Sequence, residues 1–171
     1  MPGHGHRCEV HGEVSFVAAH ITGDLNCGSS LLFNPTGRAL HCEDLVVESV
    51  FLSRHDPELP FEACGRLNFL TATVGGGFFM SNARLCPGPD YSGLLARGGP
   101  VAINMQQMRV SNAIVFFNVG AMEADPAERH TDSIRPVEGW FMLAGAQMNT
   151  LIVHVGTGWP RPGYLDIDGM S

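Results

Sequence analysis

The chain repeats a strand-like segment at a fixed interval, and this repetition limits the folds open to it more than any other feature. The segment from Gly12 to Cys27 returns in altered form from Gly65 to Met80, an offset of 53 positions. The offset superposes Gly12 on Gly65, Phe16 on Phe69, Ala19 on Ala72, Ile21 on Val74, Gly23 on Gly76 and Leu25 on Phe78. Alternate residues in both segments are small or apolar, and this period of two is typical of β-strands.

Shorter or looser copies of the same pattern continue along the chain. They lie at 45–52, 108–117 and 139–153. A strand pattern that recurs every few tens of residues is typical of stacked coils, in which each coil covers the apolar edge of its neighbour. The sequence therefore predicts an all-β protein, a right-handed β-solenoid (parallel β-helix).

Turn-forming residues separate the expected strands. The segments 34–40 (NPTGRAL) and 55–61 (HDPELPF) place Pro, Gly, Asn and Asp between alternating runs. A β-sandwich is the alternative fold, because it also contains many short strands joined by turns. A sandwich does not require internal repeats, so the solenoid is the preferred interpretation.

A chain of 171 residues has the length of one compact domain, so we expect a single domain over 1–171. Regular coils are expected over 8–85. From 86 to 155 the pattern indicates divergent coils with irregular insertions, at 86–100 and 123–136. The segment 156–171 has little periodicity and is expected to be a C-terminal cap or tail.

The charge composition excludes several functions. The formal net charge is −7, and the 10 basic residues are all arginine. A chain without lysine has neither a P-loop lysine for a β/γ-phosphate nor a lysine for a Schiff base with pyridoxal phosphate or a carbonyl substrate. Nucleic-acid affinity depends on clustered positive charge, so the acidic balance and the scattered arginines also predict no nucleic-acid ligand.

The five cysteines are Cys8, Cys27, Cys42, Cys64 and Cys86. Their odd number and the absence of a CxxC pair or an apolar leader argue against a disulfide framework. The longest apolar segments, such as 113–122, are far shorter than the roughly 20 residues needed to cross a bilayer. We therefore expect a cytoplasmic protein with no integral membrane segment.

Three consecutive segments resemble units of a known repeat family. These are 12–27 (GEVSFVAAHITGDLNC), 34–52 (NPTGRALHCEDLVVESVFL) and 61–79 (FEACGRLNFLTATVGGGFF). In this order they resemble a bacterial family labelled membrane-associated oxidoreductase, a β-solenoid family akin to pentapeptide-repeat proteins. The resemblance covers 8–85 and implies chiefly a fold, because the family label brings no catalytic motif that can be carried onto particular residues.

The N-terminal segment contains four side chains of the kinds that bind zinc or copper, His4, His6, Cys8 and His11. The offset of 53 places Cys8 on Phe61, which predicts an inward-facing residue, and structural zinc usually takes two ligand pairs spaced across a fold. A metal site is therefore one hypothesis. The preferred one is a frayed strand end with a core cysteine, and no cofactor is expected.

Two other groups of residues have competing interpretations. Alternation places Cys27 and Cys42 among inward apolar residues, where a thiol behaves as a small hydrophobe. In the C-terminal segment, Trp159, Arg161 and Tyr164 form an aromatic and arginine group of the kind that supplies interface hot spots. We predict either a partner contact at these three residues or a cap on the last coil.

Two classes of function remain. The preferred one is a non-catalytic solenoid scaffold whose faces and ends bind a protein partner or a second copy of the chain. The alternative is an oxidoreductase-like enzyme, as the family label suggests, with its site in the irregular C-terminal half. The candidate residues for such a site are His130, Asp132, Arg135 and Glu138.

Overall fold

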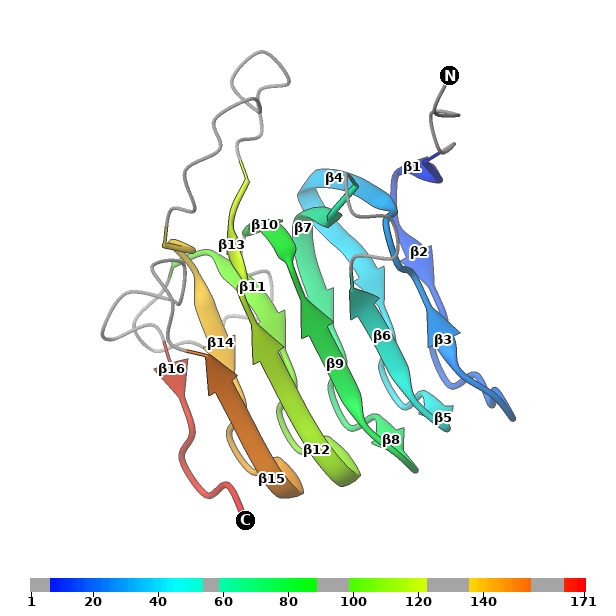
Figure 1. Ribbon diagram of the computed structural model, residues 1–171, viewed down its shortest axis with the longest axis vertical. Coiled ribbons are helices and arrows are strands. Elements are labelled where there is room, and N and C mark those ends of the chain that lie inside the picture. Colours follow the sequence, from blue (N-terminus) through cyan, green and yellow to red (C-terminus); the bar gives the residue numbers. More distant parts are fainter. Residues whose placement is uncertain (1–6, 54–58, 89–98, 123–135, 155–164) are drawn as a thin grey trace.

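The structure, a computed structural model, describes residues 7–53, 59–88, 99–122, 136–154 and 165–171. Within these residues every regular element is a β-strand, and no helix is present. The strands form two sheets that pack against each other across a shared core (Figure 1). The prediction of an all-β protein is confirmed.

The first sheet has nine strands, which are β1 (Glu9–His11), β2 (Val14–Ser15), β4 (Leu31–His41), β7 (Phe61–Asn68), β10 (Ala83–Cys86), β11 (Val101–Asn104), β13 (Gly120–Ala121), β14 (Trp140–Met142) and β16 (Leu165–Asp166). The second has seven strands, which are β3 (Leu25–Asn26), β5 (Val46–Val47), β6 (Val50–Ser53), β8 (Thr73–Val74), β9 (Phe78–Ser81), β12 (Arg109–Phe117) and β15 (Gln147–His154).

All pairings between these strands are parallel. Parallel neighbours cannot be joined by a tight hairpin, and here the chain passes through the other sheet before it returns. The β-sandwich alternative does not match these pairings, because sandwiches of that class are built from antiparallel sheets.

One passage of the chain through both sheets is called a rung below. Rung 1 contains β1–β3, rung 2 β4–β6, rung 3 β7–β9, rung 4 β10–β12 and rung 5 β13–β15, while residues 165–171 form a partial rung 6. Ser15 pairs with His41, and His41 pairs with Asn68. The sequence offset of 53 positions therefore spans two rungs, of 26 and 27 residues.

The same tight turn leads from the first sheet to the second in every rung. Its third residue has a positive φ in all six cases, namely Ala18, Asp44, Thr71, Gln107, Gly145 and Gly169, with φ between 52° and 68°. The next residue donates its backbone N–H back to the first residue of the turn, for example Ala72 to Phe69 at 3.1 Å. The six rungs therefore share one backbone geometry at this turn.

The core lies between the two sheets. Every second residue of a strand points into it. Phe69, Phe78, Phe116 and Phe141 are buried there and contact one another in sequence along the rungs. Burying a side chain of this size contributes roughly 1.5–3 kcal/mol to stability. Stacked inward side chains thus hold each rung to the next.

Strand β4 departs from regular pairing with β7. The register shifts between Phe33 and Arg38, where β4 has more residues than the facing part of β7. Gly65 fills the narrow place opposite this bulge at φ +118°, and a Cβ atom there would clash with the Asn34 carbonyl oxygen and lie 3.0 Å from the Ala39 nitrogen. Only glycine fits this position.

Candidate interaction site at the first rung

Rung 1 lies at one end of both sheets (Figure 1, blue). In the part of the chain that the structure describes, its strands pair on one side only, with rung 2. The N–H groups of Phe16 and Leu25 donate to rung 2 carbonyls at 2.7 and 2.9 Å. Backbone groups alternate in direction along a strand, so the N–H groups of Ser15 and Asn26 lie on the outer edge. Such an edge is a template for pairing with another chain.

Leu25 of rung 1 is buried, but most of the other inward side chains of this rung are apolar and only half-buried. Val10, Val14, Phe16 and Ile21 pack against the core on the side of rung 2. Phe69, at the position equivalent to Phe16 but with a rung on either side, is completely buried. The outer side of rung 1 therefore presents apolar surface beside open backbone edges.

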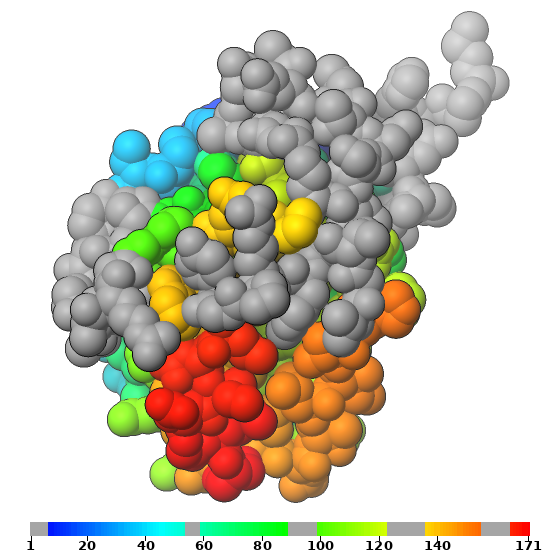
Figure 2. All heavy atoms as spheres, turned by 90° about the vertical axis from the view of Figure 1, so that its left-hand side faces the viewer, coloured from blue at the N-terminus to red at the C-terminus, as the bar shows by residue number. Residues whose placement is uncertain are grey.

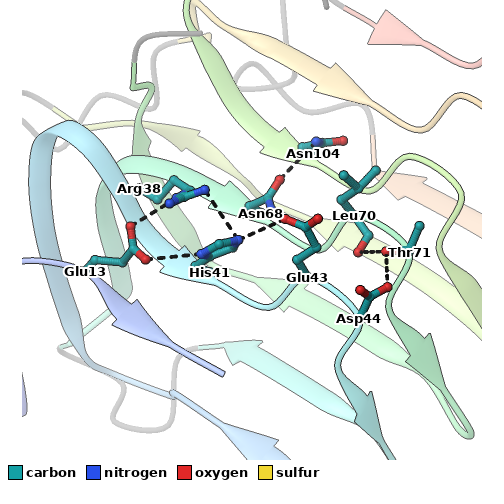
Figure 3. Close-up of polar contacts among 9 residues, drawn as sticks. All are labelled: Glu13, Arg38, His41, Glu43, Asp44, Asn68, Leu70, Thr71 and Asn104. Atoms are coloured by element: carbon teal, nitrogen blue, oxygen red, sulfur yellow. Dashed lines mark hydrogen bonds and ion pairs between the residues drawn. The ribbon is translucent and has the colours of Figure 1, made fainter. Parts of the chain in front are cut away.

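A polar network joins rung 1 to rung 2 next to this edge (Figure 3). Arg38 donates from Nε to Oε2 of Glu13 at 3.0 Å, and Nδ1 of His41 lies 3.2 Å from Oε1 of the same carboxylate. The second ring nitrogen of His41, Nε2, lies 3.1 Å from Oε2 of Glu43 and 3.4 Å from Nη1 of Arg38. His41 is 8% exposed and holds a carboxylate at each ring nitrogen.

Glu13 is the member of this network that comes from rung 1. Burial by itself would raise the pKa of its carboxyl group, but the hydrogen bonds and positive charges of Arg38 and His41 outweigh that effect and hold the pKa below its usual value. The ionised form is the one these partners bind. Glu13 thus attaches the outermost rung to the rest of the molecule.

A column of polar residues continues from His41 through the next rungs. His41, Asn68 and Asn104 occupy equivalent positions on neighbouring strands. Asn104 donates from Nδ2 to Oδ1 of Asn68 at 3.0 Å, and both side chains are buried. In the adjacent turns Thr71 donates to Oδ1 of Asp44 at 2.6 Å. The contact between Asn68 and Asn104 satisfies buried polar groups, and both contacts join one rung to the next.

Neither the network nor the column was predicted from the sequence. The offset of 53 aligns Ser15 with Asn68, a polar match inside an otherwise apolar repeat, and that match is the signal that could have indicated the column. Glu13 and Arg38 could not be paired from the sequence, because their contact depends on the bulge that carries Arg38 toward rung 1.

Cys27 and Cys42 belong to the core, as predicted from alternation. Burial raises the pKa of the Cys27 thiol to about 11, with a further contribution from the charge of Cys8. Burial also raises the pKa of Cys42, and Cys27 adds to that effect. A raised pKa disfavours the reactive thiolate, so these two thiols act as packing groups.

The N-terminal metal hypothesis can be compared with the structure at two of its four residues, because His4 and His6 lie outside the described residues. Cys8 and His11 are both exposed. The strand register aligns Cys8 with Phe61, as the offset predicts, but Cys8 is exposed, because no described strand covers the outer side of rung 1. The ring of His11 contacts Phe33, with ring centroids 5.5 Å apart. Among the described residues no three His, Cys, Asp or Glu side chains are placed to hold a metal ion.

The C-terminal predictions fall mainly outside the described residues. This is true of Trp159, Arg161 and Tyr164, the predicted partner contact. It is also true of His130, Asp132 and Arg135 from the alternative enzyme site, whose fourth residue, Glu138, is exposed. Both hypotheses therefore stay predictions.

No helix in the described part of the chain is long and apolar enough to span a membrane. No protein-family model, curated protein or solved structure matches the chain. The resemblance to the oxidoreductase-labelled repeat family accordingly stays a prediction from the quoted segments.

Proposed function

We propose that the chain is a right-handed β-solenoid that works as a non-catalytic scaffold, with a protein docked on the outer edge of rung 1. The observation that carries the proposal is the combination found there: edges in both sheets that pair with no strand of the described residues, and half-buried apolar side chains between them. Proteins usually cover or interrupt such edges, because an exposed edge pairs with other chains. An edge left open beside apolar surface fits a docking site.

The parallel pairings and the repeated turn support the solenoid. The strands pair in parallel with strands of neighbouring rungs, and the turn with a left-handed third residue recurs in all six rungs. The handedness follows from the general preference of parallel crossover connections, which are right-handed in nearly all proteins.

The chemistry of the polar groups supports a scaffold over an enzyme. Glu13, Arg38, His41 and Glu43 bond to one another across two rungs, and this arrangement is what a structural cross-link requires. The core thiols Cys27 and Cys42 have raised pKa values. We place the protein in the reducing cytoplasm, in keeping with its five cysteines, none of which forms a disulfide in the structure.

Sedimentation velocity on the untagged protein at several concentrations tests the proposal. We expect the wild-type protein to associate, and Asn26→Pro to weaken that association at least tenfold, because proline removes an N–H from the outer edge of β3. Thr73→Asp, an exposed change on the same sheet in rung 3, is the matched control and should leave association unchanged.

Native mass spectrometry with metal analysis provides the contrary test. A monomeric protein that carries stoichiometric flavin, nicotinamide nucleotide or metal would overturn the scaffold in favour of the oxidoreductase alternative. A metal without an organic cofactor would direct attention to His4, His6, Cys8 and His11.

A further inference from the structure

We infer that the protein docked on rung 1 is a second copy of this chain, placed rung 1 to rung 1 in a closed two-fold dimer. This inference rests on the proposed function and names the partner at the same site. It follows from the shape of the two ends of the molecule and from their backbone edges.

The two ends have different shapes. Rung 1 has strands in both sheets, so its outer side is a complete face. At the other end the described residues form a step, because β16 adds a strand to the first sheet while β15 is the last strand of the second. Figure 2 shows this end, with residues 165–171 in red beside β15 in orange. A stepped end does not stack flush on a complete rung, whereas two complete rungs do.

The contact between two such faces is large enough for a specific dimer. About eight residues along β1 and β2 span about 26 Å at the usual rise per residue, and two sheets about 10 Å apart with their outer side chains are about 20 Å thick. Face-to-face contact then buries about 500 Å² on each copy, or about 1,000 Å² in total, which reaches the lower limit for specific interfaces.

A two-fold axis through the interface makes the partner strands antiparallel. The edge of β1 and β2 then pairs with the same edge of the second copy, and β3 pairs with the partner's β3. Antiparallel pairing satisfies the outward backbone groups as well as parallel pairing does. The arrangement is isologous, so it uses up both complete rungs and association stops at two copies.

Two exposed apolar residues of almost equal exposure allow a matched test. Val17 lies in the turn of rung 1 and is 45% exposed, while Ile167 lies in the turn of rung 6 and is 46% exposed. We expect a wild-type dimer whose size does not increase with concentration. Val17→Asp should raise its dissociation constant at least tenfold, and Ile167→Asp should change it less than twofold.

Hydrogen exchange keeps the test independent of how well a variant folds. At concentrations where the wild-type protein is dimeric, the amides of Ser15 and Asn26, one from each sheet, should gain protection that is absent in dilute protein.

Val17→Arg, which reverses the sign of the added charge beside Glu43, should weaken the dimer as Val17→Asp does.

Three results would overturn the inference. Oligomers that grow beyond two copies, or a dimer lost in Ile167→Asp and kept in Val17→Asp, would place the contact at other surfaces. If one of these two results is found but Asn26→Pro still weakens the association, docking on rung 1 is retained and only the rung-to-rung dimer is contradicted. A wild-type protein that is monomeric at every concentration, with Ser15 and Asn26 unprotected, contradicts the rung-to-rung dimer.

Discussion

At the scale of single residues, Gly65 is the position where the fold depends most on one amino acid. Gly65→Ala adds a Cβ atom that clashes with the Asn34 carbonyl and imposes a strained backbone at φ +118°. We expect it to lower the free energy of unfolding by more than about 3 kcal/mol, since backbone strain alone costs roughly 1–3 kcal/mol. Urea denaturation followed by circular dichroism measures this change.

Substitutions at two other glycines distinguish the cost of the clash from the cost of the strained backbone. Gly12 has nearly the same φ, +119°, but no atom lies within 4 Å of the place that a Cβ atom would take, and Gly23 has open space without a positive φ. Gly12→Ala should therefore cost only the strain, about 1–2 kcal/mol, and Gly23→Ala less than about 1 kcal/mol. Equal losses at Gly65 and Gly12 would show that the bulge in β4 adjusts to the added methyl group.

Glu13 gives a residue-scale prediction about pH. Its pKa is lowered below 4.5 in the folded protein, so the folded state holds this proton less tightly than the unfolded state. The stability from Glu13 is present above pH 4.5 and is lost as the pH falls through the folded-state pKa. We expect Glu13→Gln to destabilise the protein at about pH 7 and to have little effect near about pH 3, measured by denaturant unfolding.

Glu9→Gln is the matched control for Glu13, because Glu9 is an exposed carboxylate of the same rung. It should change stability little at either pH. An effect of Glu13→Gln that is the same at neutral and acidic pH would mean that the contacts with Arg38 and His41 do not stabilise the folded protein.

At the scale of elements, the repeated turn predicts substitutions of opposite sign. Gly145 has φ +68° and Ala18 has φ 52° at equivalent turn positions. Gly145→Ala places an alanine in the left-handed region and should destabilise by about 1 kcal/mol, while Ala18→Gly removes that strain and should be neutral or stabilising by up to about 1 kcal/mol. Thermal unfolding of both variants checks the signs, and two changes of equal sign would contradict the shared turn geometry.

The elements also show why the sequence predicted some features and missed others. Strands such as β8 and β9 follow from the period of two and from the copy at an offset of 53, because local alternation and stacking impose the same pattern. The sequence did not predict that the first-sheet part of rung 4 consists of two strands, β10 and β11, because the chain between them departs from the repeat. The Glu13–His41–Glu43 network was also missed, because it joins separate rungs through a bulge whose geometry comes from Gly65 and Asn34, not from any local period.

At the scale of the whole molecule, stability is distributed by rung position. Rung 3 pairs its strands with rungs 2 and 4, while rung 1 pairs its strands only with rung 2 among the described residues and reaches rung 3 through the ion pair of Arg7 with Glu62. In a stack of this kind each unit is stabilised mainly by its immediate neighbours. Docking at rung 1 would therefore give a second neighbour to an end rung, which links the proposed dimer to the stability of the fold.

This distribution predicts a difference between two otherwise matched amides. Phe16 and Phe69 occupy equivalent positions, and each donates its N–H to the next rung at 2.7 Å, to His41 and Asn104 respectively. In the Val17→Asp variant, which should be monomeric, the Phe16 amide should be at least tenfold less protected from hydrogen exchange than the Phe69 amide. Exchange at Phe16 requires only the contact between rungs 1 and 2 to open, whereas exchange at Phe69 requires more of the stack to open. Equal protection would mean that the molecule opens as a single unit. In concentrated wild-type protein the protection of Phe16 should rise while that of Phe69 stays constant, because only rung 1 gains a neighbour.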